Sequence, residues 1–433
     1  MRPMTEVSGL TFHPREGWIG NDPRQPMRLS RRGFLAAAAA TGLAGVAGCS
    51  SKGGSGASAT TTSTAPLALP RPDNPVTWPL YSSNKAIADN LTPEKNATLK
   101  VYNWVAYINQ KDLDAFGKKY NCKVELTTFN TMTEAISKLR SGQFNFDVFV
   151  PTVDVLGQLV AGKIIQPLNH TYIPNISQAW TEFTNPFYDQ AWQYTVPYTI
   201  YTTGLAWRKD HVPEDPSTMA NPWAFPWQAK YKGKVAVLDD YRESMSLGLM
   251  KSGFFDLNTS DTSQLAAATN TLLDLDKLVN LHIDNNDYSN VPSGQIWIHY
   301  AWSGDMAAAA GYMPKGTPVD VIGYWFPTDG KGPVGNDTMT VLSGGKNPVL
   351  AHLFLNYMMD LPNVLENISY NGYMQPINGV TPDALVQQGL LPPSLTSTVV
   401  LPSYFDNGLR ELQLAPSVDA EWQQSWLRVS GGV

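Results

Sequence analysis

The sequence predicts an α/β protein in which strands and helices alternate in two separate series. The first series begins at the apolar strand pattern of residues 98–104, and the second begins near Gly233. Within each series, patterns with a period of two residues alternate with amphipathic helical patterns. The chain has 433 residues, which is more than one hydrophobic core usually serves. We therefore expect two α/β units with parallel sheets.

The first series predicts three strands and three helices. The strands are TLKVYNW (98–104), CKVELTTF (122–129) and DVFVP (147–151), and the helices are NQKDLDAFGKKY (109–120), TMTEAISKLRSG (131–142) and VDVLGQLVAGK (153–163). Thr131 is placed to cap the second helix and Gly142 to end it. Cys122, in the second strand, is expected to be a small buried apolar residue.

The second series predicts a longer alternation. Its strands are VAVL (235–238), IWIHYAW (296–302), PVDVIGYWF (318–326) and TMTVLSGG (338–345), and its helices begin near Tyr241 and cover TSQLAAATNTLLDLDKLVN (262–280), SGDMAAAAGYM (303–313) and VLAHLFLNYMMD (349–360). No internal repeat is found. Two such units suggest two lobes around a cleft.

Aromatic and acidic residues stand just after the predicted strands, where parallel sheets bind their ligands. These residues are Trp104, Thr152, Asp240, Trp302 and Asp337. Carboxylates bind ammonium groups by charge-assisted hydrogen bonds, and aromatic faces attract the same cations. The combination, without Lys or Arg, suits an aliphatic polyamine.

Each of these residues, taken alone, also has a structural explanation that needs no ligand. A Trp after a strand is usually packing. Asp240 and Glu243 have the D-x-x-E spacing of a helix capping box, so they are expected to cap a helix, to bind a ligand, or both. Asp305 is placed to be a charge at a helix N-terminus, and Asp337 to be a turn residue.

The N-terminal region has the order of features that an export signal shows. Paired Arg31 and Arg32 precede an Ala/Gly-rich run that ends at Cys49. S-R-R-x-F-L resembles a twin-arginine signal, and V-A-G-C resembles a lipobox whose cysteine is lipidated. Residues 1–48 are then a lipoprotein signal peptide and residues 49–97 a flexible tether. The alternative is a chance Ala-rich helix with a stray cysteine, and translation starts at either Met1 or Met27.

Charge and motifs exclude several functions. The net charge is −6, and the first 49 residues contribute six Arg against three acidic residues, so we expect no nucleic-acid partner. The GxGxxG match at residues 330–335 contains Pro333 and does not open a helix. The six His are scattered, and no metal or nucleophile motif is present. We expect no catalytic residue, no metal and no cofactor.

Five sequence blocks in order resemble the spermidine/putrescine-binding proteins of bacterial ABC transporters. The blocks are YNWVAYI (102–108), DVFVPT (147–152), DDYRE (239–243), AWSGD (301–305) and NGYMQP (371–376). The resemblance covers about residues 98–430. It implies a two-lobed type II periplasmic-binding-protein fold that closes on a polyamine in a central cleft. The first lobe is expected at 98–198 plus 338–384, the second at 199–337 plus 385–433, and the hinge near Tyr198 and Asp337.

The resemblance also implies the ligand-binding residues. The aromatic walls are expected to be Trp104, Tyr107, Trp302 and Tyr373. The amine-binding carboxylates are expected to be Asp240, Glu243, Asp305 and Asp337, and the small hydroxyl residue is expected to be Thr152.

The chain departs from the family pattern at three places. Val105 and Ala106 stand where the family has a hydroxyl residue and an acid, and Asp154 stands where members show a Tyr. Gly335 replaces a common aromatic. Residues 324–326 (Tyr, Trp, Phe) are expected to supply the missing ring.

The resemblance implies a lipid-anchored monomer on the outer face of the cytoplasmic membrane, which delivers a polyamine to an ABC permease. Three alternatives stay open: the same fold with another amino-containing solute, an exported enzyme, and a structural surface lipoprotein.

Overall fold

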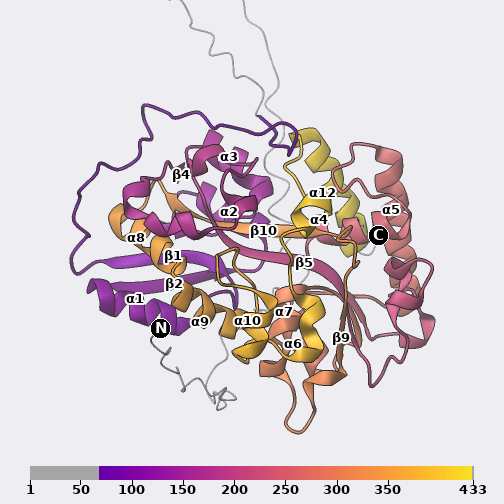
Figure 1. Ribbon diagram of the computed structural model, residues 1–433. Coiled ribbons are helices and arrows are strands. Elements are labelled where there is room, and N and C mark those ends of the chain that lie inside the picture. The colour runs from indigo at the N-terminus through magenta and orange to yellow at the C-terminus, as the bar shows by residue number, and fades with distance from the viewer. Residues whose placement is uncertain (1–67, 432–433) are drawn as a thin grey trace, which may run out of the picture. The chain divides into compact units, whose positions relative to one another are not determined.

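A computed structural model describes residues 68–431 (Figure 1). The predicted signal peptide, Cys49 and the first part of the predicted tether lie outside the described residues. None of the helices within 68–431 is long and apolar enough to cross a membrane.

One mixed sheet runs through the described residues. Its strand order is β2-β1-β3-β10-β5-β8-β6-β7, with β4 on β10 and β9 on β5. The strands are β1 (Thr98–Trp104), β2 (Lys123–Phe129), β3 (Val148–Phe149), β4 (Ile165–Gln166), β5 (Val196–Arg208), β6 (Val235–Val237), β7 (His282–Ile283), β8 (Ile298–Trp302), β9 (Ile322–Trp325) and β10 (Val334–Leu342). The predicted parallel pairing is confirmed at the two ends, for β1 with β2 and β3 and for β6 with β7 and β8. The middle of the sheet is antiparallel, because β5 and β10 run against their neighbours.

Helices pack on both ends of this sheet. They are α1 (Gln110–Tyr120), α2 (Met132–Arg140), α3 (Leu156–Ala161), α4 (Tyr241–Lys251), α5 (Thr262–Val279), α6 (Asp287–Ser293), α7 (Ser303–Ala307), α8 (Pro348–Met358), α9 (Leu361–Asn371), α10 (Pro382–Gln387), α11 (Tyr404–Asn407) and α12 (Pro416–Ser430). The predicted cap of α2 is confirmed, since Thr131 accepts a hydrogen bond from the backbone N–H of Glu134 at 3.2 Å. Helices α4, α5 and α12 contact one another over a core that includes Leu272, Tyr300 and Trp422.

The two ends of the sheet meet where β5 pairs with β10, in the middle of Figure 1. Asp337 of β10 pairs with Thr199 of β5, and the register shifts between Asp337 and Thr338. Such an irregularity bends the strands and re-aims a side chain. Tyr198 and Asp337, the predicted hinge residues, both lie at this junction, and their role as a hinge stays a prediction.

The segment of residues 68–97 is packed against the body, so the predicted flexible tether is too long. This segment, which we call the strap, is drawn in indigo in Figure 1. Trp78 is 3% exposed and donates from its Nε1 to the carbonyl of Tyr188 at 2.8 Å. Asn84 donates to the carbonyl of Ile165 at 2.8 Å. The packing of this segment could not be predicted, because its apolar residues are isolated between prolines and polar residues and follow no period.

The end of the strap caps a helix. The Glu94 carboxylate accepts hydrogen bonds from the backbone N–H groups of Val349 and Leu350, at 3.1 and 3.0 Å, in the first turn of α8. Helix N-termini leave such donors without intrahelical partners, and they favour negative charge. The strap therefore holds α8 from outside the helix.

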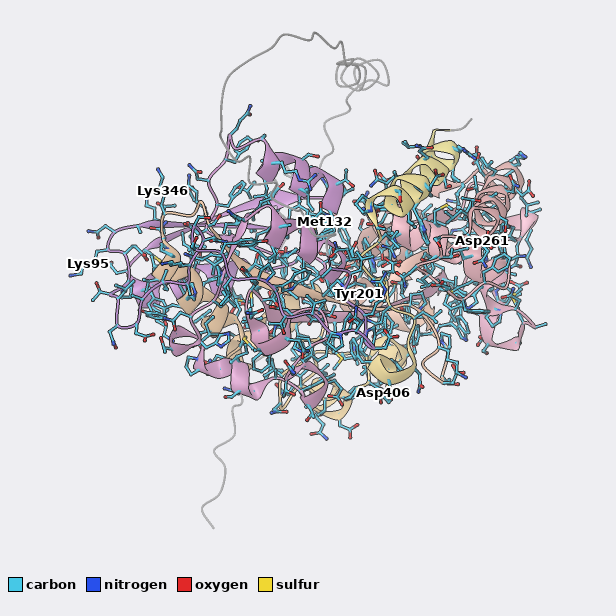
Figure 2. The ribbon with its side chains drawn as sticks, turned by 90° about the horizontal axis from the view of Figure 1, so that it is seen from above. Lys95, Met132, Tyr201, Asp261, Lys346 and Asp406 are labelled. Atoms are coloured by element: carbon cyan, nitrogen blue, oxygen red, sulfur yellow. The ribbon has the colours of Figure 1, made fainter. Side chains whose placement is uncertain are left out.

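Replacing Glu94 by Ala is expected to lower the free energy of unfolding by about 1 kcal/mol, which is typical of a lost N-terminal cap. Urea unfolding of the two proteins measures the difference. Lys95→Ala is the matched control, because Lys95 is exposed and points away from the body in Figure 2. Equal losses in both variants would show that Glu94 does not cap α8.

Candidate functional site

A cavity of about 310 Å³ lies among the carboxyl ends of the strands. All nine residues predicted to bind a ligand line it: Trp104, Tyr107, Thr152, Asp240, Glu243, Trp302, Asp305, Asp337 and Tyr373. The strand-end rule and the resemblance therefore selected residues that share one cavity. That these side chains bind a ligand stays a prediction at this point.

Asp337 is positioned at one part of the cavity by two hydroxyl-bearing residues. The Tyr107 hydroxyl lies 2.6 Å from Asp337 Oδ2, to which it donates, and 2.6 Å from Thr199 Oγ1. The second oxygen, Oδ1, is buried and has no hydrogen-bond partner. Burial raises the pKa of Asp337 to about 7, and the hydrogen bond from Tyr107 opposes this rise. A buried carboxylate with a free oxygen is costly, and a cation at that oxygen would remove the cost.

Glu243 is positioned in the same way from α4. Its Oε1 accepts hydrogen bonds from Thr203 Oγ1 at 3.0 Å and from Trp302 Nε1 at 2.9 Å. Its Oε2 is buried without a partner, and the residue is 5% exposed. Burial and the charge of Asp240 together raise the pKa of Glu243 to about 8.

The predicted capping box forms only in part. Asp240 is the N-cap of α4, and its Oδ1 accepts from the backbone N–H groups of Arg242 at 2.8 Å and Glu243 at 3.2 Å. Glu243 does not complete the box, because its bonded oxygen is held by Thr203 and Trp302. Asp240 thus combines a cap with a place in the cavity wall, and burial raises its pKa to about 6.

Asp305 lies next to a second acid that the sequence did not suggest. Asp287, at the start of α6, is close enough to Asp305 to act on it electrostatically, and its Oδ2 accepts from the backbone N–H of Trp302 at 3.1 Å. Burial raises the pKa of Asp305 to about 6. Burial and the charge of Asp305 place the pKa of Asp287 well above its usual range. Of these two acids, Asp305 is the one that lines the cavity.

Aromatic rings form the walls between these acids. The ring of Tyr107 stands edge-on to Tyr373, with 4.7 Å between centroids. Tyr373 also stands edge-on to Tyr201 at 6.3 Å. Trp104 packs on Phe129 at 4.6 Å, and its Nε1 is buried without a partner. The walls therefore combine flat apolar ring surfaces with one N–H donor, that of Trp104, which has no hydrogen-bond partner.

The ring that replaces the missing aromatic comes from Tyr201, and the expectation that residues 324–326 supply it is wrong. Tyr201 pairs directly with Gly335 across β5 and β10, and a Cβ atom at Gly335 would lie 2.4 Å from Tyr201 Cζ. The Tyr201 ring therefore fills the space that a side chain at 335 would take. Tyr201 lines the cavity, and it is labelled near the centre of the view in Figure 2.

Sequence reasoning also missed part of the charge of the cavity. Three more acids line it: Asp154, Glu411 and Asp419. Asp154 was visible only as a departure from the family pattern, and the other two lie in the C-terminal segment, where no strand end points to them. The cavity lining holds seven carboxyl groups against two guanidinium groups, those of Arg140 and Arg242. Such a lining favours a cationic ligand.

Comparisons with known proteins agree on one family. Residues 112–392 match the model of the family described as bacterial extracellular solute-binding protein. The spermidine/putrescine-binding periplasmic protein of Escherichia coli is 27% identical over 285 residues, which are 65% of this chain and 78% of that protein. The putrescine/cadaverine-binding protein of Pseudomonas aeruginosa is 24% identical over 62% of this chain and 76% of that protein.

Solved structures share the fold. A Listeria monocytogenes protein that is provisionally assigned to a spermidine/putrescine ABC transporter is similar with a TM-score of 0.67 and 23% identity, over 77% of this chain and 98% of its own. The TpPotD lipoprotein of Treponema pallidum is similar with a TM-score of 0.62 and 21% identity, over 77% and 99%. These likenesses confirm the predicted periplasmic-binding-protein fold.

Proposed function

The chain belongs to the bacterial extracellular solute-binding proteins, and we propose that it binds a linear polyamine in the cavity described above and delivers it to an ABC importer. One observation carries the proposal. Glu243 and Asp337 are both buried in the cavity wall, and each keeps one oxygen without a hydrogen-bond partner.

The chemistry of those two oxygens selects an amine. A buried carboxylate is stable only when it is paired, and an ammonium group brings both a positive charge and hydrogen-bond donors. Tyr107, Tyr201 and Tyr373 present rings that attract the same charge and pack methylene groups. The names of the relatives in Escherichia coli and Pseudomonas aeruginosa support the same ligand class.

The strand β5 sets the length of the ligand. Thr199, Tyr201 and Thr203 lie on one face of β5, because side chains alternate along a strand. Thr199 is hydrogen-bonded to the Tyr107 hydroxyl that holds Asp337, and Thr203 holds Glu243. Four residues of strand separate these positions by about 13 Å, at roughly 3.3 Å per residue.

A diamine matches this separation, and a triamine exceeds it. An extended chain advances roughly 1.2 Å per bond, so the five bonds of putrescine span about 6 Å and the nine bonds of spermidine about 11 Å. One ammonium hydrogen bond at each end adds about 3 Å, so the reach is about 12 Å for putrescine and about 17 Å for spermidine. We therefore infer that putrescine reaches both carboxylates when it is extended and that spermidine reaches both when it is bent.

The transport role rests on the sequence motifs and the family. We propose that Cys49 is lipidated, that the protein works as a monomer outside the cytoplasmic membrane, and that closure of two lobes around the ligand is the form that the permease recognises. Mass spectrometry of the mature N-terminus tests the anchor. A Cys49→Ala variant is expected to be released from the membrane fraction, and retention there would contradict the anchor.

We propose no catalytic role for the cavity. Three histidines have backbone carbonyls as ring partners, with 2.8 Å or less between the atoms: the exposed His170 with Trp192, and the buried His299 and His352 with Tyr300 and Pro348. None of these contacts is a nucleophile–base pair. The residues that line the cavity bind and orient, and no bond is broken.

A thermal-shift screen of amines, amino acids and sugars tests the ligand class. Spermidine and putrescine are both expected to raise the melting temperature, and amino acids and sugars are expected to leave it unchanged. Asp240→Asn keeps a side chain that caps α4 well but removes one charge from the cavity, so its shift with spermidine is expected to be smaller. If no amine stabilises the wild-type protein, the polyamine proposal is wrong.

Gly335→Ala is expected to weaken spermidine binding about tenfold. The new Cβ atom pushes the Tyr201 ring out of place, and a cation–ring contact is worth about 0.5–2 kcal/mol. Titration calorimetry measures the change. Gly311→Ala is the matched control, because a Cβ atom there meets nothing within 4 Å. Unchanged affinity in Gly335→Ala would show that the ring does not contact the ligand.

A further inference from the structure

Glu411 is a carboxylate of the cavity that neither the strand-end rule nor the family resemblance assigns. It lies in the connection before α12 and lines the cavity together with Glu243. Its position is fixed by α4, since Ser246 donates from Oγ to Glu411 Oε1 at 3.1 Å. Glu243 and Ser246 are three residues apart on α4 and so lie on the same face of the helix. Glu411 is therefore presented along the face that carries Glu243.

The segment that carries Glu411 is held firmly. Arg242 donates to the carbonyl of Leu412 at 3.0 Å and to Asn258 Oδ1 at 2.8 Å, and its guanidinium lies over the ring of Trp422 at 4.9 Å. Asn258 Oδ1 in turn accepts from the backbone N–H of Leu412 at 2.7 Å. The Arg242 guanidinium thus holds this segment in place by hydrogen bonds, next to the acids of the cavity.

The Glu243 oxygen without a partner points to a ligand at this place. Oε2 of Glu243 is buried, and the residue is 95% shielded from solvent and lines the cavity. Two neighbouring carboxyl groups repel each other when both are ionised. The pKa of the half-buried Glu411 lies above its usual range because of desolvation and the charge of Glu243. A cation between the two carboxyl groups pairs with the free oxygen of Glu243 and offsets the repulsion between the two negative charges. Asp154 lines the same cavity and is close enough to act electrostatically on Glu411.

We propose that Glu411, Glu243 and Asp154 together bind the primary ammonium end of the polyamine, and that Glu411 makes this end of the cavity selective for a charged chain end. The three carboxyl groups come from three separate segments of the chain, and an ammonium group has three N–H donors, one for each of them. The inference rests on the proposed polyamine function. It adds a residue and a selectivity that the function alone does not need.

Titration calorimetry of the full chain with spermidine and its two monoacetylated forms tests the inference. Acetylation removes the charge from one end at a time. Glu411→Gln is expected to lower the affinity for spermidine at least tenfold. One of the two acetylated forms is expected to bind wild type at least tenfold more weakly than spermidine does. The affinities of this form for wild type and for Glu411→Gln are expected to agree within about twofold, because its neutral end no longer meets Glu411. Glu421→Gln, an exposed acid on α12, is the matched control and should match wild type.

The outcomes separate this inference from the proposed function. Equal spermidine affinity in wild type and Glu411→Gln would overturn the role of Glu411 and leave the polyamine function standing. Absence of binding by any amine to wild type would overturn both. If Glu411→Gln does not fold, Ser246→Ala is measured in its place. A loss of about threefold or more would support the inference, because this variant frees Glu411 from its hydrogen bond, and unchanged affinity would overturn it.

Discussion

Replacing Glu243 by Gln is expected to weaken spermidine binding about 100-fold. The variant keeps the size of the side chain and the oxygen that accepts from Thr203 and Trp302. It removes the charge and replaces the free oxygen, Oε2, by an NH₂ donor that meets an ammonium group unfavourably. Truncating one partner of a buried, hydrogen-bonded charge pair typically costs about 2–5 kcal/mol, and about 3 kcal/mol corresponds to a 100-fold change in Kd.

Asp239→Asn is the matched control for this prediction. Asp239 belongs to the same DDYRE block and is exposed, but it does not line the cavity. Titration calorimetry of both variants is expected to show wild-type affinity for Asp239→Asn and a large loss for Glu243→Gln. Similar affinities in the two variants would mean that the charge of Glu243 does not contact the ligand.

Spermidine affinity is expected to rise steeply between pH 6 and pH 8. In the free protein the pKa values of Asp337 and Glu243 are raised to about 7 and about 8, so both groups hold protons at pH 6. An ammonium group needs the ionised carboxylates, and alkyl ammonium groups stay charged over this range, since their pKa is near 10.4. Binding therefore releases protons, and affinity rises by up to about tenfold per pH unit for each group. Titrations at pH 6, 7 and 8 measure the slope, and a flat profile would contradict it.

The stability of the free protein is expected to change in the opposite direction. A carboxyl group whose pKa is raised on folding stabilises the folded state below its unfolded pKa, and that contribution is lost as the pH rises through the folded value. For Asp337 and Glu243 the loss falls between about pH 4 and pH 8. The free protein should thus melt at a higher temperature at pH 5 than at pH 8.5, and spermidine should restore stability most at pH 8.5. Calorimetric melting at the two pH values, with and without spermidine, tests the direction of both changes in melting temperature.

The sequence predicted the two ends of the sheet and most of the cavity for a physical reason. Parallel strands share an edge, so residues that follow them, such as Asp240 and Trp302, meet in space although they are far apart in the chain. Local signals also placed the helix ends, as the Thr131 cap of α2 shows.

The central strand β5 escaped prediction because it carries no alternation. Nearly all of its thirteen residues are buried, so both faces are apolar or satisfied internally, and it contains Pro197 and Gly204. Tyr201 was missed with it. Glu411 was missed because its place depends on Ser246 and Arg242, which are distant in sequence.

Titration of the wild-type protein with spermidine at pH 8 tests the central claim most directly, which is that buried carboxylates with free oxygens hold an amine. The expected result is saturable binding of one spermidine per chain, with protons released to the buffer. Absence of binding by every amine at this pH, or binding without release of protons, would contradict the account.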